Sequence, residues 1–335
     1  MPGNRKRGQD IRNFILANVE QHPEDVARVT ADKFQITRQT ANEHLRRLAA
    51  ENILTGHGDT SARVYKLQVT GKFEKTYQLP GQGEHEVLDA DVLPVIDGLP
   101  ENVKSIWSTA FTEMYNNVLD HSAATEAEVK IRKTAIWTDM VIHDNGIGVF
   151  KKIQQALNLP EERYAIVQLS KGKFTTDRSK HSGEGIFFTS KMVDDFDILS
   201  DGLSFTGKQN TQLDWIPEKF KKGTTVWMKL SNKSTRQPKD VYDKFTENFA
   251  FNKTTVPVKL AQVGSSLVSR SQAKRILARF EQFKTVQLDF SGVEWVGQAF
   301  ADEIFRVYKN AHPEVQIEVV NVNEDVDKMI QRAKA

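Results

Sequence analysis

Cysteine is absent from the 335-residue sequence. This absence excludes disulfide bonds, thiolate metal sites and a cysteine nucleophile, and it suits a reducing compartment. The sequence also lacks a run of about 18 apolar residues, which a membrane-spanning helix would need. Its basic N-terminal segment, residues 1–10, has no apolar core of the kind found in signal peptides. We therefore expect a cytoplasmic protein without a membrane segment.

The net charge is also close to zero: 46 Lys and Arg residues and 44 Asp and Glu residues give a formal charge of +2. This balance excludes a protein that attracts nucleic acid through its overall charge, so any affinity for DNA must come from a local patch. Hydrophobic residues make up 39% of the sequence, which suffices for packed cores. At roughly 100–200 residues per domain, the length predicts two or three domains.

Two polar stretches that contain proline divide the sequence, one at residues 79–83 and the other at residues 231–239. Stretches of this composition are typical of linkers. We therefore predict three domains and a multidomain α/β fold overall. The predicted domains are residues 1–78, 84–232 and 240–335.

The first domain is predicted to be mostly helical. Apolar residues recur at helical spacing in three stretches before residue 50, and Thr37 is suited to cap the third helix at its N-terminus. Alternating residues between positions 53 and 67, around a turn at residues 56–59, predict a β-hairpin after the helices.

Three helices followed by a hairpin resemble a winged helix-turn-helix, an α+β fold, and residues 36–48 resemble its turn and recognition helix. Short and forked polar side chains near the start of such a helix reach base edges, while arginines contact phosphates. The expected DNA contacts are Arg38, Gln39, Thr40, Asn42, Arg46, Arg47 and, in the wing, Arg63. The net charge of residues 1–70 is only +3. A protein-docking module with the same fold therefore remains an alternative.

The middle domain contains four short blocks of polar residues and glycines. The first block lies in a helix that is predicted to begin near Glu101 and contains Glu113 and Asn117, four residues apart and so on one face. An asparagine oxygen is a suitable ligand for Mg²⁺, and a nearby carboxylate can orient a water molecule for attack.

The other three blocks each adjoin a predicted strand or helix. Asp144 follows a strand-like stretch and precedes Gly146 and Gly148; a carboxylate placed there can accept a hydrogen bond from an adenine amino group. Gly183 and Gly185 open a predicted helix, whose first N–H groups can bind phosphate oxygens. The fourth block, residues 223–225, leads into an alternating strand.

In order and spacing, these blocks resemble the N, G1, G2 and G3 boxes of the GHKL ATPase superfamily (gyrase, heat-shock chaperone, histidine kinase and MutL), over residues 100–232. The resemblance implies an α/β sandwich that binds ATP and Mg²⁺. It implies that Asn117 holds Mg²⁺ and that Asp144 binds adenine, with Thr224 near the adenine subsite. Four glycines would then approach the nucleotide or hold its phosphates: Gly146, Gly148, Gly183 and Gly185.

The resemblance further implies that residues 158–181 form a mobile lid over ATP. Four cations in or beside this segment are candidate phosphate partners: Lys171, Lys173, Arg178 and Lys180. For each of them, a place on a solvated loop is the alternative.

Whether the protein is an enzyme depends on Glu113. In GHKL proteins that hydrolyse ATP or phosphorylate proteins, a carboxylate at this place can act as general base; alternatively, Glu113 only supports the Mg²⁺ shell or lies on the helix surface. The usual histidine-kinase arrangement is not expected, because the first domain stands where the acceptor hairpin would be. No histidine pair has the spacing of a zinc site, so Mg²⁺ is the only metal expected.

The last domain alternates predicted strands and helices, which indicates an α/β layer fold. Residues 286–301, together with residues 269–275 and 300–304, resemble a STAS domain, and more closely a STAS-like bacterial domain of unknown function that is found after GHKL modules. In anti-sigma antagonists a serine in the loop after the central strand is phosphorylated. Residues 297–300 have no hydroxyl group there, and Ser291 is expected to be a turn residue. The resemblance implies a protein partner.

Together these features predict an ATP-binding bacterial regulator of transcription, in which a GHKL domain controls a winged helix bound to DNA and a STAS-like interaction domain. The alternatives are a protein kinase (Ser/Thr or His) or a slow ATPase acting on an unseen partner. A homodimer is one assembly that the sequence leaves open, because winged-helix proteins often bind palindromic sites as symmetric dimers.

Overall fold

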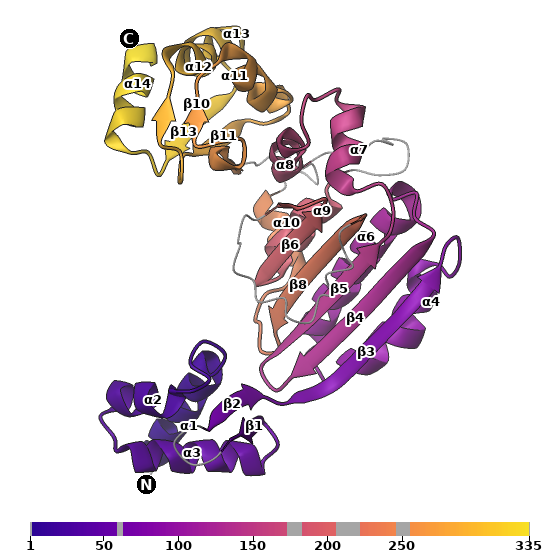
Figure 1. The fold of residues 1–335 in the computed structure, drawn as a ribbon, viewed down its shortest axis with the longest axis vertical. Helices are drawn as coiled ribbons and strands as arrows, with labels where there is room; N and C mark the ends of the chain where they lie inside the picture. The colour runs from indigo at the N-terminus through magenta and orange to yellow at the C-terminus, as the bar shows by residue number, and fades with distance from the viewer. Residues whose placement is uncertain (1, 59–62, 173–182, 206–221, 246–254, 335) are drawn as a thin grey trace.

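The computed structural model describes residues 2–58, 63–172, 183–205, 222–245 and 255–334. A helical N-terminal module and a C-terminal α/β domain lie at opposite ends of a large β-sheet (Figure 1). In the described part of the chain, no helix combines the length and apolar composition needed to cross a membrane.

The N-terminal module contains three helices and a two-stranded hairpin, namely α1 (Pro2–Asn18), α2 (Val26–Phe34), α3 (Arg38–Ala50), β1 (Leu54–His57) and β2 (Val64–Leu67). Its core is formed by apolar residues one helical turn apart, such as Ile15 on α1 and Val19 just after this helix, which are fully buried. Thr37 Oγ1 accepts a hydrogen bond from Thr40 N at 3.1 Å, which confirms the predicted N-cap. The start of the predicted turn is wrong, because Gly56 and His57 belong to β1 and pair with β2.

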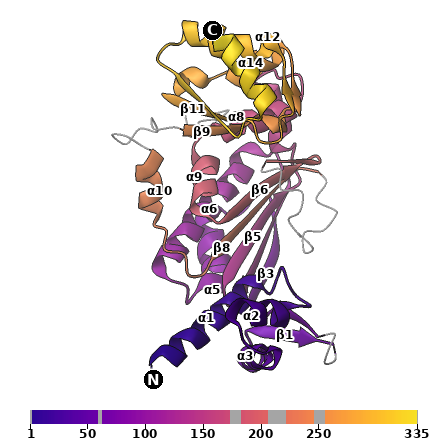
Figure 2. The ribbon, with the colours of Figure 1, turned by 90° about the vertical axis from the view of Figure 1, so that its left-hand side faces the viewer.

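The central sheet has six antiparallel strands in the order β3-β4-β5-β8-β6-β7. The strands are β3 (Val69–Gln78), β4 (Glu126–Thr134), β5 (Trp137–Asp144), β6 (Asp195–Ser200), β7 (Leu203–Ser204) and β8 (Thr224–Ser231). Alternate residues of β5 and β8, including Met140 and Met228, are fully buried in the core shared with the helices. Figure 2 shows α6 and α9 on the same side of this sheet.

Strand β3 corrects the predicted end of the first domain. Residues 69–78 pair with β4 along their whole length and form an edge of the central sheet. Only Gln68 separates β3 from β2 of the hairpin. The N-terminal module therefore ends near residue 68 rather than at residue 78, and the stretch at residues 79–83 follows a strand of the sheet.

The helices that accompany the sheet are α4 (Glu84–Val87), η2 (Leu88–Val92), α5 (Leu93–Ile96), α6 (Glu101–His121), α7 (Val149–Ala156), α8 (Arg163–Ser170), α9 (Gly185–Met192) and α10 (Pro238–Phe245). Helix α6 begins at Glu101, as predicted, and buries an apolar face that includes Trp107 and Phe111. The predicted linker at residues 231–239 ends in α10, whose Tyr242 and Phe245 pack against aromatic rings of α9.

The C-terminal domain is built on three parallel strands in the order β13-β11-β9. Its elements are β9 (Thr255–Lys259), η3 (Leu260–Gln262), β10 (Ser266–Leu267), α11 (Arg270–Leu277), η4 (Phe280–Gln282), β11 (Thr285–Asp289), β12 (Trp295–Val296), α12 (Gln298–Asp302), η5 (Glu303–Tyr308), α13 (Lys309–Ala311), β13 (Gln316–Val320) and α14 (Glu324–Lys334). The predicted helix at residues 298–310 is present, but its middle, η5, has π-helical geometry.

The N-terminal module contacts the sheet through Trp137, the first residue of β5. Its ring packs into the core of the module, and its Nε1 donates a hydrogen bond to Glu20 Oε2 at 3.0 Å. Lys229 Nζ lies 3.1 Å from the same oxygen and 4.2 Å from the centroid of the Trp137 ring. This contact lies at the opposite end of β5 from Asp144.

Candidate functional site

The four blocks singled out in the middle domain converge on one cavity of about 280 Å³. Helix α6 supplies the first block, the end of β5 the second, the start of α9 the third and the start of β8 the fourth. The predicted site residues that line the cavity are Glu113, Asn117, Asp144, Gly148, Gly183, Gly185 and Thr224. The first and last of these residues, Glu113 and Thr224, are more than 100 positions apart in the sequence, so the fold brings them together.

Asp144 places a buried carboxyl group at the cavity wall. Its Oδ1 accepts a hydrogen bond from Gly146 N at 2.8 Å. Burial raises the pKa of Asp144 to about 6, although hydrogen bonds from Gly146 and Thr224 act in the opposite direction. The Thr224 hydroxyl also accepts a hydrogen bond from Val149 N at 3.0 Å, which ties the start of β8 to the start of α7. Near neutral pH the cavity therefore presents a negatively charged acceptor in a wall that contains both polar and apolar side chains.

Two positions around Asp144 admit only glycine. Gly223 has φ +90°, and a Cβ atom there would lie 1.9 Å from the carbonyl oxygen of Asp144. A Cβ atom on Gly146 would lie 2.1 Å from the carbonyl oxygen of Ser122. Both neighbours are backbone atoms, which cannot move aside as a flexible side chain can. These glycines keep the turns beside Asp144 tightly packed.

Glu113 and Asn117 lie one turn apart on α6, both half-buried and both on the cavity wall. The Glu113 carboxylate lies against the backbone of Gly185, since a Cβ atom on Gly185 would lie 2.0 Å from Glu113 Oε2. Gly185 is the first residue of α9, so the acid faces the N-terminal end of that helix. Glycine at this position leaves room for a carboxylate beside the helix terminus.

The donor set fits Mg²⁺ only in part. In the described ranges, no three His, Asp or Glu side chains gather into a group that could hold a metal ion. Asn117, whose side chain has one amide oxygen, lines the cavity. Because Mg²⁺ commonly keeps several water molecules and binds ligand phosphates through one or two protein groups, a single asparagine is compatible with a Mg²⁺ ion that arrives with its nucleotide.

Sequence reasoning missed Lys152 of α7. This half-buried side chain lines the cavity, and its Nζ donates a hydrogen bond to the carbonyl oxygen of His121 at 2.5 Å. Burial lowers the pKa of Lys152, and Asp120 opposes this shift. Lys152 stands four residues after Gly148, one turn into α7, and this helical spacing could have revealed it.

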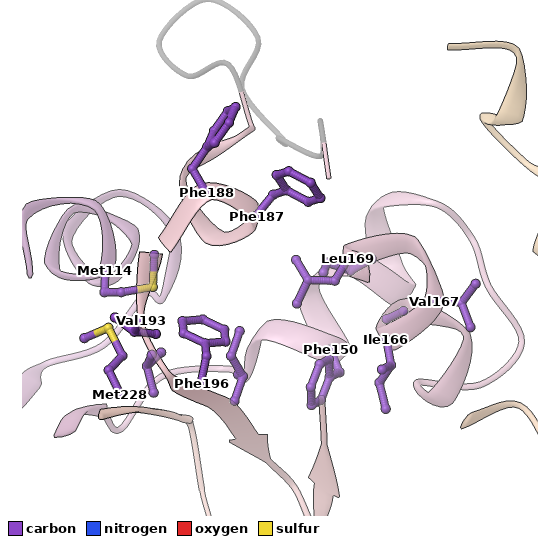
Figure 3. Close-up of a cluster of buried hydrophobic side chains, with 14 of the residues drawn as sticks. Met114, Phe150, Ile166, Val167, Leu169, Phe187, Phe188, Val193, Phe196 and Met228 are labelled. Atoms are coloured by element: carbon purple, nitrogen blue, oxygen red, sulfur yellow. The ribbon is translucent and has the colours of Figure 1, made fainter. Parts of the chain in front are cut away.

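The apolar part of the cavity wall comes from helices on both sides. Leu169 of α8 and Phe187 of α9 both line it and face the same space (Figure 3). Phe187 is also packed against Phe245 of α10, at 5.2 Å between ring centroids. The Phe187-Phe188 pair therefore joins the cavity wall to α10.

The predicted mobile lid is wrong over its first half. Residues 163–170 form helix α8, whose side chains from Tyr164 to Leu169 are buried. Lys171, predicted as a phosphate partner, is fully buried, and its Nζ hydrogen-bonds to carbonyl oxygens of the C-terminal domain. These oxygens occupy its donors, so Lys171 does not face the cavity as a free cation. The other candidates, Lys173, Arg178 and Lys180, lie outside the described residues.

The predicted DNA contacts lie on the outer side of the N-terminal module. Arg38, Gln39 and Arg46 are exposed on α3, and Asn42 is half-buried. Thr40 is less available, because its hydroxyl lies 3.0 Å from Thr37 Oγ1 in the N-cap. In the hairpin, Arg63 is exposed, with its guanidinium 5.5 Å from the centroid of the Tyr65 ring.

In the C-terminal domain, the central strand β11 is followed by a turn and a helix. Ser291 N donates to Asp289 Oδ1 at 2.9 Å, and Gly292 has φ +77°, so Ser291 is a turn residue as predicted. Residues 272–327 match the STAS-like domain of unknown function DUF4325. The matched segment begins inside α11 and ends inside α14. No curated protein matches the chain.

Proposed function

We propose that this chain is an ATP- and Mg²⁺-binding regulator of the GHKL type, whose nucleotide site controls a winged-helix DNA-binding module. One observation carries the proposal: four blocks that resemble the N, G1, G2 and G3 boxes line a single cavity. A lone glycine-rich turn is weak evidence. Four blocks on the expected helix, strand end, helix start and strand start support a common ligand much more strongly.

In this proposal each residue type has a chemical task. The Asp144 carboxylate accepts a hydrogen bond from the adenine amino group, and Thr224 completes the adenine subsite. The N-terminal end of α9, at Gly185, faces the phosphates, where the first N–H groups of the helix and its dipole favour negative charge. Asn117 binds Mg²⁺, which would neutralise phosphate charge when bound. Lys152 is a further cation that the cavity offers to a phosphate group.

The STAS-like domain gives the regulator a region suited to a protein partner. It lacks a hydroxyl at residues 297–300, so transfer of phosphate to a serine in this loop has no acceptor. We therefore propose that the domain responds to the nucleotide site by contact and not as a phosphoryl acceptor.

We propose that strand β5 couples the nucleotide site to the DNA-binding module. This strand carries Trp137, held by Glu20 of the N-terminal module, at one end and Asp144 at the other. A ligand changes DNA affinity only if it binds the two states of the protein differently. We expect saturating ATP with Mg²⁺ to change DNA affinity by at least about fivefold. Fluorescence anisotropy on a DNA site selected from a random library measures this change.

The variant Arg38→Ala/Gln39→Ala tests which part reads DNA. Loss of two base-contacting side chains is expected to weaken specific binding by about 100-fold. Lys6→Ala is a matched control, because it also removes one positive charge from an exposed helix position in the same module. Equal affinities for the two variants would instead support a protein-docking module.

The alternative function is enzymatic, and the position of Glu113 against Gly185 favours it. With ATP labelled at the γ-phosphate, a slow ATPase would release labelled phosphate, while a kinase would label a protein. If Glu113 is the general base, Glu113→Gln is expected to slow either process by about 100-fold or more while ATP binding persists.

Glu101→Gln is the control for this experiment, because Glu101 lies on the same helix with its side chain 89% exposed. Unchanged turnover in Glu113→Gln would exclude the base role. If the wild-type protein binds ATP but transfers no label, ATP acts as a bound signal alone.

A further inference from the structure

The wall of the cavity formed by α8 is held by the STAS-like domain. Leu169 and Gly172, at the end of α8 and just after it, line the cavity. The same helix contacts β9, η3 and α11 of the C-terminal domain. Figure 1 shows α8 between the central sheet and that domain. One short segment therefore belongs to both the cavity wall and the domain interface.

Lys171 fixes this segment to the C-terminal end of α11. Its Nζ donates to the carbonyl oxygens of Ile276 at 2.7 Å and Ala278 at 2.6 Å, and to Gln168 Oε1 at 3.0 Å. Gln168 Nε2 donates to the carbonyl oxygen of Arg275 at 2.8 Å. The last carbonyl groups of a helix lack partners within the helix and carry partial negative charge, so an amine is well placed to bind them.

Because Lys171 is buried, the loss of any of these hydrogen bonds would be costly in free energy. None of its surface is exposed, and burial, followed by the nearby charge of Arg279, lowers its pKa well below the ordinary value. A buried amine needs all of its hydrogen-bond partners in place. Any movement of α8 away from α11 would leave this group and the helix carbonyls unpaired. The contact therefore favours one defined arrangement of the two elements.

Arg279 extends the contact to the cavity itself. Its backbone is left-handed, with φ +69°, in the turn that follows α11. Its Nη2 donates to the carbonyl oxygen of Gly172 at 3.0 Å. Gly172 lines the cavity, so a side chain of the STAS-like domain binds the backbone of the cavity wall directly.

We propose that Lys171 and Arg279 are positioning residues of the nucleotide site, through which docking of the STAS-like domain sets the affinity for ATP. This inference rests on the ATP-binding function proposed above. It makes the STAS-like domain part of the site and not only a downstream partner. By thermodynamic reciprocity, ATP must then strengthen the contact between α8 and α11.

Titration of the full chain with ATP and Mg²⁺ by calorimetry tests the proposal. We expect Arg279→Gln and Lys171→Met each to weaken ATP binding about tenfold, and Arg279→Lys, which retains a donor, to restore much of the affinity. Arg332→Gln, at an exposed position of α14 in the same domain, should bind like the wild type. Wild-type affinity in folded Arg279→Gln and Lys171→Met would overturn the proposal.

Hydrogen exchange of the wild-type protein provides a test that needs no variant. ATP is expected to slow amide exchange at residues 163–172 and also at residues 274–280. Protection confined to the first segment, or absent from both while ATP binds, would overturn the coupling even if the variants failed to fold. If the wild type binds no ATP, the proposed function fails and this inference fails with it; if ATP binds without coupling, only the inference fails.

Discussion

Replacing Asp144 by asparagine is expected to weaken the proposed ATP binding by about 100-fold. The charged hydrogen bond to the adenine amino group is lost, and an amide NH2 donor faces that amino group instead. The side chain is almost fully buried at the cavity wall, so water cannot substitute for the lost acceptor. Asparagine keeps one oxygen that can accept from Gly146 N, so the fold should persist. Calorimetric titration with ATP and Mg²⁺ measures the change.

The pH dependence of binding is an internal control for Asp144. Its pKa is raised from 3.8 to about 6, so the folded protein favours the protonated carboxyl group. The contribution of this group to folding stability is therefore lost as the pH rises through about 6. The proposed adenine contact needs the carboxylate, so ATP affinity should have the opposite dependence and should fall as the pH drops below about 6. Asp144→Asn should lack this step, whereas titration of the ATP phosphates would appear in both proteins. Equal pH profiles would contradict the adenine contact.

Gly223→Ala is expected to lower the free energy of unfolding by about 3 kcal/mol or more, and to abolish ATP binding. A left-handed alanine costs about 1–2 kcal/mol by itself. Its Cβ atom would also lie 1.9 Å from the carbonyl oxygen of Asp144, so the end of β5 would have to move. Chemical denaturation followed by circular dichroism measures the stability, and ATP titration measures the site.

Gly98→Ala is a matched control for this variant. Gly98 has φ +78°, close to that of Gly223, but a Cβ atom there would meet no atom within 4 Å. This variant should show only the cost of the backbone conformation and should bind ATP normally. If both variants lost the same stability, the close packing of Gly223 against Asp144 would have no energetic role.

Local signals in the sequence were sufficient for much of the middle domain. Helix α6 begins at Glu101 because a polar start precedes a long amphipathic pattern, and Asp144 ends a strand because an apolar run stops there. The glycines of the four blocks also mark real turns, such as the one at Gly223. These features depend on residues close together in the chain, which is why sequence patterns predict them.

The features that the sequence did not predict depend on distant contacts. Strand β3 is an edge strand in which Tyr77 is the only buried residue, and its partner β4 lies about 50 residues later. No strong local pattern therefore assigns β3 to the sheet. Lys171 looked like a loop cation because its partners, Ile276 and Ala278, are 105 and 107 positions away. The burial of a lysine depends on what the fold places around it, and composition alone does not reveal that.

The junction between the hairpin and the sheet decides which fragments of this protein can be studied alone. Gln68 is the single residue between β2 and β3, and its backbone N–H donates to the carbonyl oxygen of Ile53 at 2.9 Å. A recombinant fragment that starts at residue 84 would lack β3 and leave one edge of β4 without a partner. Such an edge is a template for strand pairing between molecules and so for aggregation. Fragments of the middle domain should therefore begin at Gln68, where the cut removes the N-terminal module and keeps the sheet whole.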